Sequence, residues 1–400
     1  MPAWGACTAV SLLVVAACVT GQPTETIAKP LTESAQPSRP TQGETQEADT
    51  SSPSTGIALS EHWWFILDVR QQSLTEAGVP ETIGGFRLRA GLFDGRGVMD
   101  IRREFPLDQA RADFVAAAPF AVIAGDEALL YGFFDGQRSQ VRLVSVPTGD
   151  DVLLYETEDI VHFAVFDHRA SVLYYVPLDL ATRRDKGVWR LPVDQPDSQP
   201  ELVIGAGRGS PRQDGWYEQL WLADGGARLV ARDCTGDGCR IQVLDTATGR
   251  MTGSRLIEDS GLEVYGVAGD RFFFDGNCER PCPVSAFSLT DGGVEGIGNI
   301  CQTAAVAEGE SGPTLLYERC PNNERRYEII AHDLQLGIER VVYEGRSTNP
   351  GLVPQSYGSA GYVAPPGWFL VGRDNSFHDQ APLMVNATNG ATVELPHLGE

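Results

Sequence analysis

Polar residues of types that could exchange protons occupy matching places in four similar segments of the chain. The segments read VHFAVF, EQLWLA, LEVYGV and QTAAVA, and in each the polar residue comes just before an apolar run. The four residues are His162, Glu218, Glu263 and Gln302. Two carboxylates and an imidazole held together could serve acid-base catalysis, or bind a cationic or sugar ligand. The alternative is that they only line a water-filled channel through the centre of the fold, and such a channel needs polar side chains in any case.

Motifs for other chemistry are scarce. The chain has no Gly-x-Ser-x-Gly elbow of an α/β-hydrolase, and its six histidines are scattered without a His-Glu-x-x-His pattern. We therefore expect no cofactor, no metal and no catalytic residue beyond the four candidates above. This poverty of motifs favours a binding protein over an enzyme.

The N-terminus, MPAWGACTAVSLLVVAACVTGQ, indicates export. Its apolar run from Ala9 to Ala17 is too short to span a bilayer and ends in small residues, as the core of a signal peptide does. The last four residues, Val15 to Cys18, resemble the lipobox of bacterial lipoproteins. That resemblance implies that residues 1–17 are a signal peptide and that Cys18 carries the lipid anchor. An ordinary cleaved secretion signal is the alternative, and both place the mature chain outside the cytoplasm.

A linker follows the predicted anchor. Residues 18–57 are rich in Thr, Pro, Ser, Glu and Gln and contain no aromatic residue. Such a segment cannot bury enough apolar area to offset its ordering entropy, so we expect it to be disordered. It would tether a folded body, residues 58–400, to the surface of a membrane of the cell envelope.

The charge balance limits the partners of this folded body. The chain has 54 acidic and 31 basic residues, a formal net charge of -23. An acidic surface repels phosphate backbones and anionic headgroups. We therefore expect no nucleic acid partner, and membrane contact through the lipid anchor only.

Residues 58–400 read as an all-β domain built from repeats. Short apolar strands recur between Gly, Asp and Asn turns, and no ten-residue stretch has convincing helical periodicity. Sets such as EALLYGFFDGQRSQVRLVSVPTGD and ARLVARDCTGDGCRIQVLDTATGR can be laid over one another. Their second turns fall near Gly149, Asp197, Gly249, Gly292, Gly337 and Gly390.

Each set predicts four antiparallel strands, which is the pattern of a β-propeller blade. Six blades fit between residues 113 and 400, and residues 58–112 supply three clear strands of another. We predict a β-propeller of seven four-stranded blades with an atypical first one; six blades plus an N-terminal extension is the alternative. The rhythm of strands and turns resembles propellers of the Tol-system and WD-repeat type, and this resemblance implies a fold without implying an activity.

Blade geometry predicts how the cysteines pair. With strands A to D counted outward from the axis, the B-to-C hairpins share one face of the ring, and the A-to-B and C-to-D turns share the other. Removing Cys7 and lipidating Cys18 leaves six cysteines, which permit 15 pairings. The blade positions favour three disulfides: Cys234 with Cys239, Cys278 with Cys282, and Cys301 with Cys320. A zinc site built from the first two pairs is the alternative.

These features together predict a lipid-tethered propeller of the cell envelope that binds or scaffolds a protein or glycan. The alternative is an extracytoplasmic hydrolase or lyase that acts on a carbohydrate or lactone at the channel mouth. Four arginines in predicted B-to-C loops, Arg183, Arg184, Arg325 and Arg326, add local positive charge that could steer an acidic partner. The ligand, the oligomeric state and the type of membrane do not follow from the sequence.

Overall fold

The computed structural model describes most of residues 63–395. The gaps in this range fall at 71–72, 75–79, 82, 93–98, 107–115, 124–127, 136, 147, 180, 183, 196, 207–215, 236–237, 259–262, 276–281, 301–303, 310–311, 320–326, 346–350, 354–361, 364–367 and 373–382. The predicted signal peptide, the lipid anchor Cys18 and the linker 18–57 lie outside the described residues. All described residues belong to one compact unit, Gly56–Glu400.

The described residues are nearly all strand, which confirms the all-β class. They form seven four-stranded antiparallel sheets and one two-stranded sheet. The first sheet contains β27 (Tyr362–Val363), β1 (Trp63–Arg70), β4 (Ile83–Leu92) and β5 (Met99–Pro106). The second contains β6 (Ala116–Ile123), β7 (Ala128–Phe134), β8 (Ser139–Ser145) and β9 (Asp151–Thr157). The third contains β10 (Ile160–Asp167), β11 (Val172–Leu178), β12 (Val188–Pro192) and β13 (Glu201–Ile204).

The remaining sheets repeat the pattern. The fourth contains β14 (Trp216–Ala223), β15 (Arg228–Thr235), β16 (Gly238–Asp245) and β17 (Arg250–Ile257). The fifth contains β18 (Glu263–Ala268), β19 (Arg271–Asp275), β20 (Cys282–Ser288) and β21 (Val294–Ile300). The sixth contains β22 (Ala304–Gly309), β23 (Gly312–Arg319), β24 (Tyr327–Asp333) and β25 (Ile338–Gly345). The seventh contains β26 (Gly351–Val353), β28 (Trp368–Gly372), β29 (Leu383–Asn386) and β30 (Thr392–Glu394). A separate pair, β2 (Ser73–Leu74) and β3 (Pro80–Glu81), and a 3-10 turn at Asp224–Gly226 complete the described elements.

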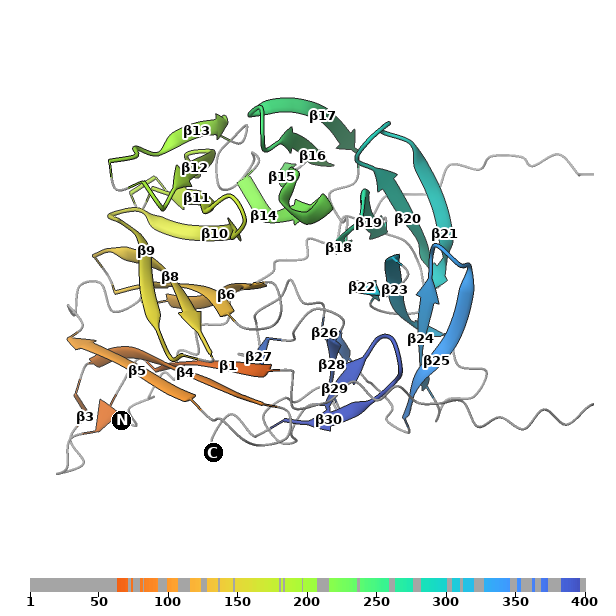
Figure 1. Cartoon of the computed structure of the whole chain (residues 1–400), viewed down its shortest axis with the longest axis horizontal. Coiled ribbons are helices and arrows are strands. Elements are labelled where there is room, and N and C mark those ends of the chain that lie inside the picture. Colours follow the sequence, from red (N-terminus) through yellow and green to blue (C-terminus); the bar gives the residue numbers. More distant parts are fainter. Residues whose placement is uncertain are drawn as a thin grey trace, which may run out of the picture. The chain divides into compact units, whose positions relative to one another are not determined.

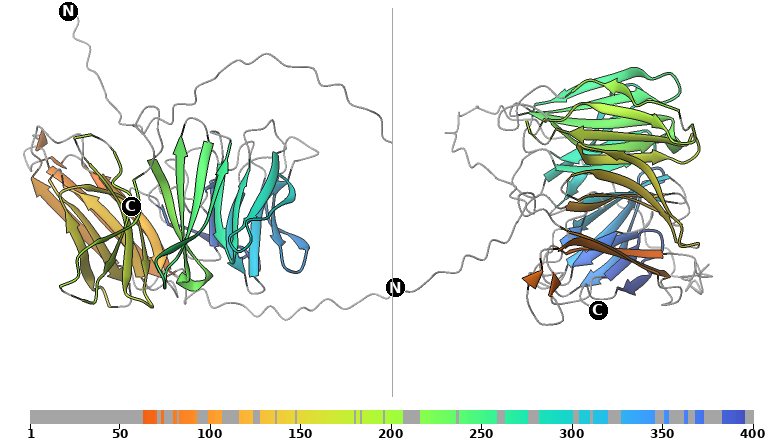
Figure 2. Two further views of the ribbon diagram at one scale, coloured as in Figure 1. Left: turned by 90° about the horizontal axis from the view of Figure 1, so that it is seen from above. Right: turned by 90° about the vertical axis from the view of Figure 1, so that its left-hand side faces the viewer.

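The sheets follow one another round a ring, which makes the domain a β-propeller (Figure 1). Each innermost strand contacts the next one, from β6 through β10, β14, β18 and β22 to β26, and β1 contacts β6. In the side views the strands run between the two faces of the ring (Figure 2).

Strand β27 joins the end of the ring to its beginning. It follows β26 in the chain but pairs with β1, where Val363 lies opposite Phe65 and Tyr362 opposite Ile66. The three strands predicted for the atypical first blade are therefore completed by a fourth from the C-terminal part of the chain. Two residues carry too little pattern for the sequence to reveal this pairing.

The core lies between neighbouring sheets, because alternate residues of each second strand point to opposite sides. Leu229 and Ala231 of β15 pack with Tyr174 of the third sheet. Val230, between them in the chain, packs with Phe272 of the fifth sheet. The second strand from the axis is buried on both faces in sheets two to seven, which explains the continuous apolar runs in the repeats.

The predicted C-to-D turns are confirmed at five glycines. Gly149, Gly249, Gly292, Gly337 and Gly390 have φ angles of 73, 66, 75, 67 and 72°. Residues other than glycine rarely adopt this left-handed conformation. In each of the five turns the glycine N–H donates to the carbonyl of the residue four positions earlier, at 2.8–3.0 Å.

The face of the ring that carries the C-to-D turns, the turn face, also has hydrogen bonds between neighbouring sheets. Arg255 of β17 donates to the carbonyl of Gly292 at 2.8 Å, and Arg340 of β25 donates to the carbonyl of Ala387 at 3.0 Å. In both cases an outermost strand reaches the C-to-D turn of the next sheet. These hydrogen bonds on the turn face therefore hold neighbouring sheets together.

The outermost strands of five sheets are interrupted by bulges. The extra residues are Leu154, Val203, Thr252, Ile297 and Val342. Four of them turn inward: Val342 is buried, and Leu154, Val203 and Ile297 pack on core clusters. Because bulges break the row of free backbone groups at a sheet edge, these edges are poor templates for another strand.

Candidate functional site

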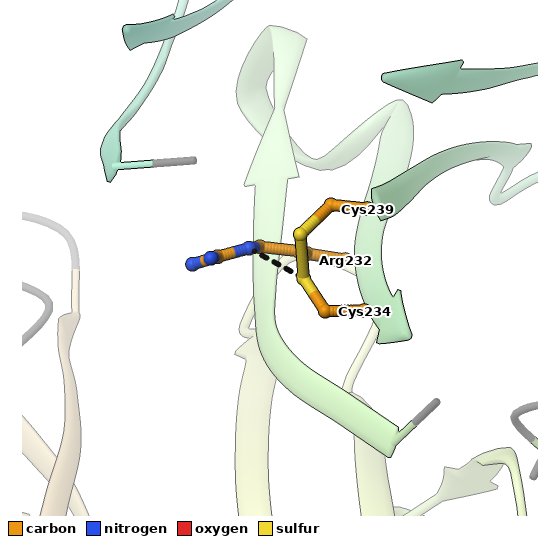
Figure 3. The surroundings of a disulfide bond; sticks show 3 residues. All are labelled: Arg232, Cys234 and Cys239. Atoms are coloured by element: carbon orange, nitrogen blue, oxygen red, sulfur yellow. Dashed lines mark hydrogen bonds between the residues drawn. A yellow bond between two sulfur atoms is a disulfide. The ribbon is translucent and has the colours of Figure 1, made fainter. Parts of the chain in front are cut away.

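The face of the B-to-C hairpins carries a disulfide, as predicted. Cys234, one residue before the end of β15, lies directly opposite Cys239 of β16, and the two form a disulfide (Figure 3). Both are nearly or fully buried, in an apolar cluster with Val230, Ile241 and Phe272. The bond therefore closes the tip of the hairpin between β15 and β16.

The other two predicted bridges remain predictions. Cys278, Cys301 and Cys320 lie outside the described residues. Cys282 is on β20 opposite Ile300, and its side chain is also outside the description. Among the described residues there is no group of three or more His, Cys, Asp or Glu that could hold a metal ion.

Two of the four polar candidates, which the blade geometry places near the mouth of the central channel, lie on innermost strands at points where the pairing is irregular. His162 is the extra residue of a bulge in β10, between Val161 and Phe163. Glu218 is the extra residue of the equivalent bulge in β14, between Tyr217 and Gln219. Bulges re-aim side chains and are frequent beside functional sites.

Among the three candidates on described strands, His162 and Glu218 share the predicted register and Glu263 does not. Glu263 of β18 is regularly paired with Asp275, and the extra residue of that strand is Tyr265. Counted from the A-to-B turns, Glu263 is at the level of Phe163 and Gln219, one position on from His162. A bulge shifts register by one residue, and the apolar pattern alone does not locate it. Gln302 and the side chains of Glu218 and Glu263 lie outside the described part.

His162 is held in its neutral form. Burial lowers its pKa to about 4, and the nearby carboxylate of Asp185 opposes this only in part. Its ring lies against that of Phe163, with centroids 4.1 Å apart. A neutral, half-buried imidazole can accept or donate one hydrogen bond, but it is a weak general base near pH 7. The environment of His162 therefore supports lining or hydrogen bonding more than proton abstraction.

A buried Tyr–Asp pair lies on β18 and β19 of the fifth sheet, and the sequence did not predict it. Tyr265, the bulged residue of β18, donates from its hydroxyl to the Asp275 carboxylate at 2.5 Å. Both residues are nearly fully buried. The sequence held a signal, a tyrosine within the apolar run LEVYGV, but only the bulge explains why it meets the second strand.

Among the described residues of the predicted positive face, one positive charge is neutralised by an ion pair. Arg184 is exposed in the connection between β11 and β12, while Arg183, Arg325 and Arg326 lie outside the described residues. Lys186, in the same connection, forms a 2.8 Å ion pair with Asp159. The positive charge of this hairpin therefore rests on the arginines.

Comparisons with known proteins identify a fold and no family. No family model matches the chain, and no curated protein matches it. A prolyl endopeptidase structure is similar with a TM-score of 0.50 and 12% identity over 84% of this chain, which spans only 49% of that peptidase. TolB from Acinetobacter baumannii is similar at 0.40 with 12% identity, over 83% of this chain and 79% of TolB.

A third similar structure carries the fold in its name. The β-propeller domain of the Trilobed protease from Pyrococcus furiosus matches with a TM-score of 0.47 and 9% identity, over 70% of this chain and 84% of that domain. At these identities the likeness concerns the fold alone. The described part of the chain contains no helix that could cross a membrane.

Proposed function

We propose that the chain is a lipid-tethered binding propeller of the cell envelope, which recognises a protein or glycan through the face of its B-to-C hairpins. The observation that carries this proposal is the contrast between the two faces. Five C-to-D turns repeat one conformation, and two of them accept a hydrogen bond from the neighbouring sheet. The B-to-C connections differ in sequence and length from sheet to sheet, and the one between β15 and β16 is closed by a disulfide.

The sheet edges support the same choice of face. Bulges interrupt five outermost strands, so strand addition at the rim is disfavoured. Loops that vary on a rigid scaffold commonly carry binding residues. The lipid anchor at Cys18 and the location outside the cytoplasm rest on the N-terminal motif, and the intact mass of the membrane-extracted protein tests them. A mature chain that begins at residue 18 or later without lipid would remove the anchor.

The enzymatic alternative depends on the channel mouth. Bulged His162 and Glu218 in neighbouring sheets are the observation in its favour. An acid-base role requires a titrating group near neutral pH, whereas the pKa of His162 is about 4. The double substitution Glu218→Ala and Glu263→Ala distinguishes the two: loss of turnover of a carbohydrate or lactone substrate with an unchanged melting curve would favour the enzyme.

Crosslinking in intact cells, followed by affinity capture of the lipidated protein, tests the binding proposal. The test variant changes Arg183, Arg184, Arg325 and Arg326 to Glu. Its control changes Arg250, which is exposed beside a C-to-D turn, to Glu. We expect a partner that is captured with the wild type and the control and lost with the test variant. Equal capture with all three proteins would assign the partner to another surface.

A further inference from the structure

Arg232 places a buried cation against the disulfide of the fourth sheet. Its Nε donates to the Cys234 sulfur at 3.1 Å (Figure 3). The side chain comes from β15, two residues before Cys234, so both point to the same side of the strand. Arg232 is 7% exposed, Cys234 9% and Cys239 0%.

A nearby guanidinium stabilises a thiolate more than it stabilises a neutral disulfide. A disulfide sulfur is only a weak hydrogen-bond acceptor, whereas a thiolate carries a full negative charge. Cys234 and Cys239 lie in an apolar cluster with Val230, Ile241 and Phe272, and electrostatic interactions are strong in such surroundings. Arg232 therefore stabilises Cys234 much more in its reduced, ionised form than in the disulfide.

The two sulfurs differ in this respect. The hydrogen bond of Arg232 goes to Cys234, whereas Cys239, opposite it, is completely buried. Burial in apolar surroundings favours a neutral thiol. Reduction would thus leave a thiolate at Cys234 and a thiol at Cys239.

We propose that Cys234–Cys239 is an exchangeable disulfide, opened by a dithiol reductant and poised by Arg232 through the thiolate form of Cys234. The inference is independent of what the hairpin face binds. It adds a redox-sensitive element to that face, because the bond closes the tip between β15 and β16. The remaining pairing of the two strands, from Arg228 opposite Asp245 onward, does not need the bond.

The exchange balances with a dithiol that has one ionised sulfur. Its thiolate attacks the Cys234 sulfur, the more exposed of the two, and breaks the disulfide. Cys239 leaves and takes the proton of the second thiol of the reductant. That second sulfur, now a thiolate, attacks the first sulfur of the reductant, closes its disulfide and releases the Cys234 thiolate beside Arg232. The dithiol loses two electrons and the protein gains them, and a low pKa at Cys234 speeds the release.

The test measures the exchange equilibrium of the full-length protein with reduced and oxidised dithiothreitol. After an acid quench, alkylation and trypsin, Cys234 and Cys239 lie in one peptide that has no other cysteine: Asp233–Arg240 in the wild type, with a start at Leu229 in Arg232→Met and an end at Arg250 in Arg240→Met. We compare the wild type with Arg232→Met, which removes the charge, and Arg232→Lys, which keeps it. The matched control is Arg240→Met: Arg240 adjoins Cys239, but its side chain leaves the other side of the strand.

We expect Arg232→Met to lower the equilibrium constant for reduction about tenfold, equivalent to about 30 mV, while Arg240→Met leaves it unchanged. Arg232→Lys should fall between them. Equal constants for the wild type and Arg232→Met, or equal shifts in both Met variants, would overturn the proposal.

A second measurement needs no variant and covers the case in which Arg232→Met does not fold. The reduced wild-type protein is alkylated with iodoacetamide at a series of pH values, and the rate at Cys234 is followed. The proposal predicts a midpoint below about pH 7.5, as for cysteines beside a cation. A midpoint at the ordinary value of about 8.5 would contradict it.

Discussion

The chain reverses direction between strands on both faces of the ring, but the two faces stabilise these reversals differently. On one face, five C-to-D turns reverse the chain with a left-handed glycine and backbone hydrogen bonds. On the other, the hairpin between β15 and β16 is closed by a covalent bond instead. The same turn recurs in the second sheet and in the fourth to seventh sheets. The hairpins are free to differ, and variation on a rigid scaffold is where specificity is expected.

The largest expected effect comes from a glycine of the turn face. At Gly390, a Cβ would meet the Val342 carbonyl oxygen at 2.7 Å, whereas at Gly249 it would meet nothing within 4 Å. Both glycines have a positive φ. Gly390→Ala should cost about 3 kcal/mol of unfolding free energy, and Gly249→Ala only the left-handed strain of about 1 kcal/mol. Chemical denaturation measures both; equal losses would show that strain alone sets the cost and that contact with the sixth sheet does not.

The hairpin face should respond to pH through His162. Its folded pKa of about 4 lies below the unfolded value of about 6.5, so the unfolded chain binds the proton more readily. The stability that the neutral form confers is full above pH 6.5 and falls as the pH drops to 4. We expect a loss of about 2 to 3 kcal/mol over this window that His162→Gln lacks. Parallel stability curves for both proteins would rule out burial of the neutral imidazole.

Removal of the hairpin disulfide should have a moderate effect. Cys234 and Cys239 are five residues apart, and closing so short a loop stabilises the folded state by about 2 kcal/mol. The double variant Cys234→Ala and Cys239→Ala should lose this amount in denaturant titrations and keep its far-ultraviolet circular dichroism. An unfolded variant would show that the bond holds the sheet and not merely the hairpin tip.

A smaller effect is expected at the seventh C-to-D turn. The Asn386 side chain accepts hydrogen bonds from the N–H groups of Thr388 and Asn389, at 2.8 and 3.0 Å. Asn386→Ala should cost about 1 kcal/mol because these donors lose a partner. Asn389→Ala, on the exposed tip of the same turn, is the control and should cost less. The reverse order, read from melting temperatures, would contradict the assignment of the turn to Asn386.

The sequence predicted what depends on local pattern. The alternation and turn residues of the repeats located the strands of sheets two to seven, and the spacing of Cys234 and Cys239 located a hairpin tip. It could not predict β27, because a two-residue strand that pairs with residues almost 300 positions away has no local signature. The bulges could not be predicted for a related reason, because one extra residue leaves the apolar pattern of a strand nearly intact. In β18 the extra residue is Tyr265 and not Glu263.

Arg232 shows the same limit at the site. In the sequence it is one charged residue near a cysteine pair, and charged residues on strands are usually solvated. Only the fold shows that it is buried with its Nε against the Cys234 sulfur. The partners of a buried charge depend on tertiary packing, which residue spacing does not encode.

Site-specific photocrosslinking in living cells tests the central claim, that the hairpin face binds the partner, most directly. One crosslinkable residue replaces Arg184, exposed between β11 and β12, and another replaces Thr248, exposed in the C-to-D turn of the fourth sheet. The account predicts a discrete crosslinked product from position 184 and none from position 248. A product from position 248 alone would contradict it and move the binding surface to the opposite face.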